Sequence, residues 1–168
     1  MVDRLSPQRR SWLMSRVRGK NTSPEMRVRR AAHGLGLRFR LHPTNLPGKP
    51  DLVFPKYNQI LFVHGCYWHR HPGCPKASAP SSPFWRQKFR TNVARDIRVT
   101  KQLRKLGWRV AVIWECETKD PVRLARRIEG IVLRKKERYP PSNGRGKPRS
   151  WARRINGRRR IAATARRH

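Results

Sequence analysis

Apolar residues recur along the chain in two patterns, and together they predict an α/β domain. Short runs of β-branched and aromatic residues, or strict alternation with polar residues, predict strands. These runs lie at residues 37–41, 52–54, 59–63 and 108–114. Apolar positions three and four residues apart predict helices. These helices are expected within residues 1–20, from Pro24 to Gly34, from Phe84 to Leu106 and from Asp120 to Lys136.

The predicted helices carry recognisable end signals. Ser6 and Ser23 each precede a proline, and serine is a favoured N-cap while proline suits the first helical turn. Gly19, and later Gly34 with Gly36, are placed to end the first two helices. The third helix has an apolar stripe that we expect to pack in the core. Its members are Phe84, Trp85, Phe89, Val93, Ile97, Thr100, Leu103 and Leu106.

Composition divides the chain into three parts. Its 168 residues suffice for one domain and a tail, and nearly all Leu, Ile, Val and Phe precede the last helix's end. We expect an N-terminal arm at 1–22, a folded domain at 23–133 and a tail at 134–168. The tail holds fourteen Lys and Arg residues and one acid, with Pro and Gly interspersed. That composition is typical of a disordered segment that seeks phosphates.

The charge balance points to a polyanionic partner. A formal net charge of +33 repels itself unless it is neutralised, and a nucleic acid backbone is the natural counter-charge. A membrane is the weaker candidate, because no apolar run approaches the roughly 20 residues of a spanning helix. Three cysteines without a secretory segment argue against a disulfide framework and for a reducing, intracellular setting.

Cysteine and histidine gather in residues 62–74, which the strand at 59–63 should deliver at a sheet edge. Cys66, His71 and Cys74 have the spacing of a metal knuckle, and Cys116 directly after the last strand is placed to be the fourth ligand. A Cys₃His set leaves no open coordination position, so we expect a structural zinc. The alternative is that the histidines are surface residues and the cysteines a buried pair.

A second set of residues is left for catalysis. His64 and His69 lie in the same stretch but outside the knuckle, free for acid–base chemistry. Asp51 follows Pro50 at the mouth of a short apolar strand, where it is either a turn former or a hard ligand for Mg²⁺. Pro50 and Asp51 look like the first half of the nuclease pattern PD…(D/E)xK. The second half is replaced by Val63 and His64.

Two features near the N-terminus have both a purely structural and a functional interpretation. The basic helix within 1–20 is either a docking helix or an arm laid against DNA, with an apolar side chain available as a wedge. Glu25 lies in the first turn of the second helix, where the helix dipole favours a carboxylate, so capping alone can explain it.

Several long motifs resemble the very short patch repair (Vsr) DNA mismatch endonucleases. They are RSWLMSRVRGKNTSPE, LPGKPDLVF, ILFVHGCYWHRHPGC and FWRQKFRTNVARDIRVTKQLRKLGWRVAVIWEC. The resemblance covers about residues 5–118 and leaves the tail outside. It implies a restriction-endonuclease-like α/β fold, with a central mixed sheet flanked by helices and a structural zinc. The domain at 23–133 would then be an endonuclease domain.

The resemblance also implies an activity and its residues. Members nick one DNA strand, with Mg²⁺, on the 5′ side of the thymine in a T·G mismatch that arises when 5-methylcytosine deaminates. By the matching motifs, Asp51 and the backbone carbonyl of Val63 hold Mg²⁺. His69 serves as general base, His64 assists it, and Glu25 takes a catalytic role instead of capping alone.

Further residues are implied to touch DNA. The aromatic residues Tyr67, Trp68 and Trp85 would wedge into the duplex beside the mismatch, and Met14 would enter from the other groove. Here Tyr67 replaces the commoner phenylalanine, and Val63 stands where some members carry threonine. The expected partner is double-stranded DNA with a T·G mismatch, bound by a monomer in the bacterial cytoplasm at the nucleoid. Mismatch-repair proteins are candidate partners.

Two other functions remain compatible with the residues. One is a Mg²⁺-dependent DNA nuclease of the same fold without mismatch preference. The other is a zinc-stabilised DNA-binding module without catalysis, which the gathering of Asp51, His64 and His69 disfavours.

Overall fold

The computed structural model describes residues 6–16, 19–78 and 82–134, all within one compact unit, Met1–Arg134. The expected basic tail, apart from Arg134, lies outside the described residues. None of the helices described here has the length and apolar character needed to cross a bilayer.

A four-stranded mixed sheet forms the centre of this unit. Its strands are β1 (Arg40–Leu41), β2 (Leu52–Phe54), β3 (Gln59–His64) and β4 (Arg109–Trp114), in the order β1-β2-β3-β4. The first three strands pair antiparallel, and β3 pairs parallel with β4. Because parallel neighbours need a crossover, the long helix α3 (Pro83–Lys105) connects β3 to β4.

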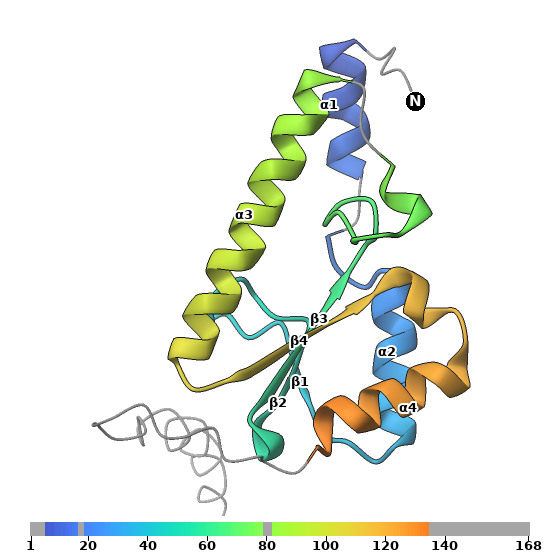
Figure 1. The fold of residues 1–168 in the computed structure, drawn as a ribbon, viewed down its shortest axis with the longest axis vertical. Coiled ribbons are helices and arrows are strands. Elements are labelled where there is room, and N and C mark those ends of the chain that lie inside the picture. The colour runs from blue at the N-terminus through green and yellow to red at the C-terminus, as the bar shows by residue number, and fades with distance from the viewer. Residues whose placement is uncertain (1–5, 17–18, 79–81, 135–168) are drawn as a thin grey trace, which may run out of the picture. The chain divides into compact units, whose positions relative to one another are not determined.

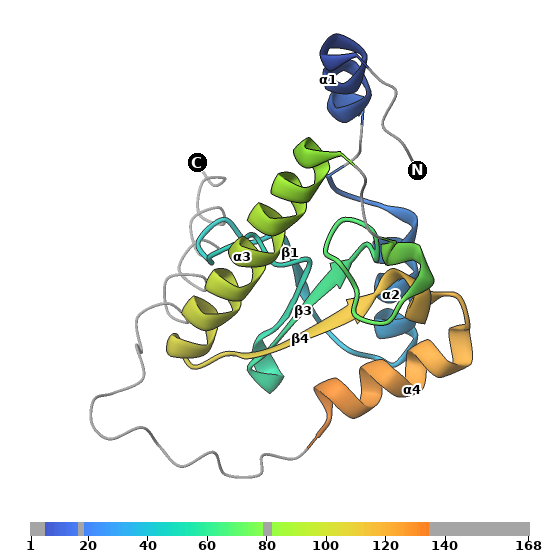
Figure 2. The same ribbon diagram turned by 45° about the horizontal axis from the view of Figure 1, so that its top comes forward.

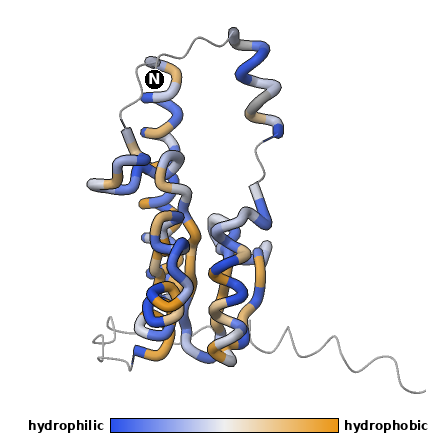
Figure 3. The backbone as a smooth tube through the Cα atoms, turned by 90° about the vertical axis from the view of Figure 1, so that its right-hand side faces the viewer, coloured by the Kyte–Doolittle hydropathy of each residue, from blue (hydrophilic) through white to orange (hydrophobic). Residues whose placement is uncertain are grey.

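Helices cover both faces of the sheet, as the expected restriction-endonuclease-like architecture requires. α2 (Ser23–Gly34) and α4 (Pro121–Val132) lie together on one face, and α3 lies on the other (Figures 1 and 2). Hydrophobic residues concentrate around the sheet (Figure 3). The core under α2 and α4 consists of Val28, Ala32, Leu37, Leu52, Phe54, Leu61, Ile113, Leu124, Ile128 and Val132.

Two predicted element boundaries were wrong. The strand expected at 37–41 shortens to β1, because β2 offers only Leu52 and Val53 as partners while Leu37 turns into the core. The last helix ends at Val132, not at Lys136. The first helix, α1 (Pro7–Arg16), falls within the predicted range of residues 1–20.

The capping predictions were partly right. Ser6 does cap α1, since its hydroxyl accepts a hydrogen bond from the Arg9 amide at 3.2 Å. Thr22, not Ser23, caps α2: its side chain accepts from the Glu25 amide, and Ser23 is already the first helical residue. Threonine is also among the favoured N-cap residues, and Thr22 has the extended backbone of an N-cap.

The apolar stripe of α3 is not all core. Phe84, Ile97 and Leu106 are 46%, 64% and 50% exposed. The buried face instead runs through Phe89, Asn92, Val99 and Leu103. This buried face includes the polar Asn92 because the middle of α3 packs against the loop after β3. There the helix and the loop are joined by side-chain hydrogen bonds, from Asn92 to the Trp68 carbonyl and between Asp96 and His69. That loop leaves the carboxyl end of β3, which is an interior strand of the sheet.

Candidate active site and metal centre

A cleft of about 700 Å³ opens at the carboxyl end of β3, between the N-terminus of α2 and the middle of α3. Every residue to which a catalytic role was assigned from the sequence lines it. Its wall includes Glu25, His42, Asp51, Val63, His64, Trp68, His69 and Asp96. These side chains come from five separate segments of the chain, which the fold brings to one place.

Asp51 is fixed at the mouth of β2 by the strand register. Leu52 faces Leu61, and the same register continued would put Pro50 opposite Val63, one step beyond the paired residues of β2. The Asp51 carboxylate takes this place: its Oδ2 accepts the Val63 amide hydrogen bond at 2.7 Å. Within an extended strand the amide and carbonyl of one residue point to the same side, so the Val63 carbonyl lies on the side of β3 where Asp51 is.

The environment of Asp51 disfavours a bare negative charge. Burial raises the pKa of this carboxyl to about 6, and the nearby Glu25 adds to the effect against the opposing hydrogen bond from Val63. A cation at this position would relieve both the desolvation and the repulsion. The oxygen and nitrogen atoms of Asp51, Glu25 and His42 that could bind a metal all lie within 4.8 Å of one another.

Glu25 makes the contacts of a capping residue, and it also lines the cleft. Its carboxylate accepts from the Thr22 hydroxyl at 2.9 Å and the Asn21 amide at 3.0 Å, which are capping contacts. It is also 5% exposed and forms an ion pair with Arg29 at 3.0 Å inside the cleft. Arg29 donates in addition to Nε2 of His42 at 2.8 Å. Burial and the Arg29 charge lower the pKa of His42.

The two histidines form a stacked pair that faces the cleft. The rings of His64 and His69 lie 3.9 Å apart at 13°. Nδ1 of His69 lies 2.5 Å from Oδ2 of Asp96 on α3. Burial lowers the pKa of His64 to about 4, and the neighbouring His69 adds to this shift. Burial acts to raise the pKa of Asp96, but the hydrogen bond and charge of His69 outweigh it and hold that pKa below its usual value.

The contact between His69 and Asp96 is the arrangement expected of a histidine base that is oriented by a carboxylate. An Asp96 carboxylate on Nδ1 fixes the tautomer and leaves Nε2 of His69 as the atom able to take a proton. His64 stays neutral across the physiological range and covers one face of the His69 ring. The His69 ring is therefore held at Nδ1 by Asp96 and on one face by the buried, uncharged imidazole of His64.

The predicted metal knuckle comes together next to the cleft. Nδ1 of His71 lies 3.5 Å from Sγ of Cys66 and 3.4 Å from Sγ of Cys116, and Cys74 completes a group within 4.8 Å. The parallel register explains the convergence: His64 pairs with Trp114, so Cys66 and Cys116 each follow two residues beyond adjacent strand ends. Three sulfurs and one imidazole could hold a metal ion.

Trp114 lies between the two groups of residues. Its ring stacks on His71 at 4.3 Å and meets His64 edge-on at 5.5 Å. Burial raises the pKa of Cys66 to about 12, so a cation among these sulfurs is what would favour the thiolate form. The last residue of β4 therefore contacts both the sulfur-rich group and the stacked histidine pair.

An aromatic cluster lies on the other side of the loop. Tyr67 and Trp68 meet Phe89 of α3 at 4.9 and 6.2 Å, and Trp68 meets Trp85 at 5.9 Å. Asn92 donates to the Trp68 carbonyl at 3.1 Å and ties the loop to the helix. Tyr67, Trp68 and Trp85 keep part of their surface exposed. Met14 is half-buried on α1 and does not line the cleft.

The sequence did not reveal three residues of the site. Asp96 could have been suspected, because it is one of only nine acids in a strongly basic chain and falls one turn after Asn92 on α3. His42 follows β1 with a φ of 41°, and nothing in its local pattern points to the cleft. Trp114 looks like an ordinary strand aromatic.

Known proteins resemble this chain in sequence. A family described as DNA mismatch endonuclease Vsr matches residues 2–75. The chain is 51% identical over 134 residues to the type II nicking enzyme V.XorIIP of Xanthomonas oryzae pv. oryzae (strain KACC10331 / KXO85), across 79% of this chain and 98% of that one. It is 40% identical over 118 residues to the DNA mismatch endonuclease Vsr of Escherichia coli (strain K12), across 69% and 75%.

Among solved structures, the catalytic domain of the homing endonuclease I-Bth0305I matches with a TM-score of 0.48 and 20% sequence identity, over 68% of this chain and 97% of that one.

Proposed function

The chain belongs to the Vsr family of DNA mismatch endonucleases, and from this membership we propose that it nicks one strand of duplex DNA on the 5′ side of the thymine in a T·G mismatch. It is thus a DNA endonuclease, for which the mismatch is the proposed target. The observation that carries the proposal is the single cleft that gathers Asp51, His64 and His69. Nicking there would initiate very short patch repair.

We assign Mg²⁺ binding to Asp51 and the Val63 carbonyl. The donor set fits a hard cation, since both offer oxygen, and the buried, charge-crowded Asp51 carboxylate favours a positive neighbour. When bound, Mg²⁺ supplies polarisation of the scissile phosphate and stabilises the leaving 3′ oxygen. The Val63 amide keeps Oδ2 of Asp51 in place, so Oδ1 is the oxygen that would be available to the cation.

His69 is the proposed general base. Asp96 anchors its Nδ1, and Nε2 can then accept the proton of the attacking water, a step that typically contributes about 10²–10⁴-fold in rate. His64 orients the ring by stacking, and its low pKa keeps a second positive charge out of the site. Glu25 contributes negative charge beside Asp51. The products would be a 5′-phosphate and a 3′-hydroxyl.

Zinc is the proposed occupant of the Cys66, His71, Cys74 and Cys116 group. Sulfur and imidazole donors with four protein ligands are typical of a closed structural site, so this ion would shape the loop and not take part in hydrolysis. The loop it shapes carries both His69 and the aromatic residues.

Mismatch preference is assigned to the aromatic cluster. Tyr67, Trp68 and Trp85 rest on Phe89 and retain exposed surface, as side chains that insert between base steps must. Prying steps apart costs a few kcal/mol, and a weak T·G pair is easier to distort than a Watson–Crick pair. Met14 on α1 would enter from the other groove. We place this activity at the nucleoid of a bacterial cytoplasm, in a monomer.

The experiment that tests the proposal is strand nicking on two labelled duplexes that differ only in one T·G or C·G pair. We expect a single nick, mapped 5′ of the mispaired thymine, on the first duplex only. Equal nicking of both would assign the chain to a nuclease without mismatch preference. Binding without any nicking in Mg²⁺ would assign it to a DNA-binding module. Asp51→Ala is the matched control, expected to bind DNA and cut neither duplex.

A further inference from the structure

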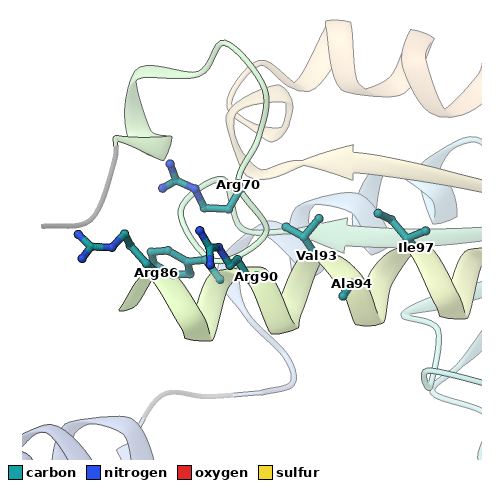
Figure 4. Close-up of a pocket in the computed structure, with 7 residues that line it drawn as sticks. Arg70, Arg86, Arg90, Val93, Ala94 and Ile97 are labelled. Carbon is teal, nitrogen blue, oxygen red and sulfur yellow. The ribbon is translucent and has the colours of Figure 1, made fainter. Parts of the chain in front are cut away.

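A second hollow lies outside the cleft, along the flank of α3. It has a volume of about 430 Å³ and is lined by Arg70 of the loop after β3 and by residues of α3. Figure 4 shows the arginines at the N-terminal end of this groove, while Val93, Ala94 and Ile97 continue along the helix. We call these arginines, Arg70, Arg86 and Arg90, the arginine end of the groove.

The arginine end is strongly cationic. No acidic residue lines the groove. Arg86 and Arg90 are four residues apart on one helix, so their side chains leave the same face about one turn apart. Like charges at this spacing repel one another by a few tenths of a kcal/mol. An anion bound among them would relieve this repulsion.

Arg70 is held in position for such an anion. Its Nη1 donates to the Ser78 carbonyl at 2.7 Å, and its guanidinium lies 5.2 Å from the centre of the Phe89 ring. Its backbone adopts a φ of 56°, a left-handed conformation that a non-glycine residue occupies only where the surrounding structure imposes it. The loop thus presents a guanidinium whose freedom is already restricted.

Phe89 connects this groove to the aromatic cluster. The ring lines the groove, and it also packs against Tyr67, Trp68 and Trp85. If those aromatic side chains insert between base pairs of a duplex, the sugar–phosphate backbone of that duplex must pass close to the protein surface next to the aromatic cluster. The groove lies directly beside that point, on the flank of α3.

We propose that the arginine end binds phosphates of the DNA strand next to the aromatic cluster. The proposal rests on the proposed function and adds a phosphate-binding surface to it. Guanidinium groups suit this ligand because they offer planar, paired donors to phosphate oxygens. Phosphate contacts fix the register of a protein on DNA without reading sequence, so these arginines position the wedge and do not select the mismatch.

The test measures equilibrium binding of a matched duplex by fluorescence anisotropy, without added Mg²⁺, over a range of KCl concentrations. In the full chain, Arg70→Gln, Arg86→Gln and Arg90→Gln together should reduce the slope of log K against log[salt] by about 3, or about 1 for each phosphate contact. Arg90→Gln alone should reduce it by about 1 and covers the case in which the triple variant does not fold.

A charge-matched control distinguishes phosphate binding at this surface from the effect of removing three positive charges anywhere on the protein. Arg30→Gln, Arg123→Gln and Arg126→Gln remove the same charge from exposed positions of α2 and α4, on the opposite face of the sheet. The control should change the slope by less than about 1. Equal slopes for the two triple variants would overturn the proposal and leave the groove to an acidic protein partner.

The mismatch assay distinguishes this outcome from failure of the proposed function. The arginine variants should keep the wild-type ratio of T·G to matched nicking. A wild-type chain that cuts both duplexes equally would defeat the mismatch assignment and leave the salt slopes, and hence the phosphate surface, unaffected.

Discussion

At the scale of single residues, Asp51 carries the most demanding role in the cleft. One carboxylate oxygen is used by the Val63 amide, and the group as a whole is buried beside Glu25. A carboxyl with its pKa raised to about 6 binds a proton readily, and a proton competes with a metal ion for the same oxygen. Its protonation should therefore be visible in the activity.

We predict an acidic limb in the pH profile of nicking. At limiting Mg²⁺, the rate should fall as the pH drops below about 6, because the raised pKa leaves Asp51 neutral there and ionised above it. Raising the Mg²⁺ concentration should move the limb to lower pH. Nicking rates across pH 4.5–8 at several Mg²⁺ concentrations check this; a limb that stays fixed over a roughly hundredfold range of Mg²⁺ would contradict the assignment.

Asp96→Asn tests the orientation of His69. Asparagine keeps the size but loses the charge that fixes Nδ1, so kcat should fall by about 10²-fold while KM for DNA stays unchanged. Asp120→Asn, which removes a carboxylate at the cap of α4 and retains a capping side chain, is the control and should keep full activity. A wild-type kcat for Asp96→Asn would show that His69 needs no carboxylate.

At the scale of elements, the sequence predicted what local patterns decide. β3, β4 and α3 have strong periodicity and appear close to their expected bounds. The knuckle was predictable because Cys66, His71 and Cys74 are near one another in sequence. β1 could not be judged from its own residues, since its length depends on a short partner strand. His42 reaches the cleft only through tertiary contacts, which no local pattern records.

At this scale, the aromatic cluster is the proposed source of mismatch preference. Trp68→Ala should retain DNA affinity within a few-fold, because phosphate contacts dominate binding. It should lose most of the preference for T·G over matched duplex, at least tenfold, if the wedge contributes a few kcal/mol. Nicking rates of both duplexes measure the ratio, and a ratio equal to that of the wild type would reject the wedge.

The group of Cys66, His71, Cys74 and Cys116 is the proposed zinc site that orders the loop after β3. Cys116→Ser should release the metal and lower the melting temperature, since a closed set of ligands contributes its binding free energy to folding. Elemental analysis should find one zinc per wild-type chain and less in the variant. Retention of a full zinc equivalent with an unchanged melting temperature would remove Cys116 from the ligand set.

At the scale of the whole molecule, one feature of topology brings the histidine pair and the Cys and His group to the same place. The parallel pairing of β3 with β4 brings their carboxyl ends together, and the loops that follow carry His69 and the four Cys and His ligands. Trp114 contacts both groups. The net charge of +33 supplies affinity for DNA of any sequence, so selectivity must come from the cleft and the aromatic cluster.

The most direct test of the separate roles proposed for Mg²⁺ and zinc measures nicking of a T·G duplex and bound zinc in the same samples. Mg²⁺ is first withheld and then restored. We expect one zinc per chain throughout, no nicking without Mg²⁺ and a single nick 5′ of the thymine once Mg²⁺ is added. Nicking that persists without Mg²⁺ and tracks the zinc content instead would contradict the account.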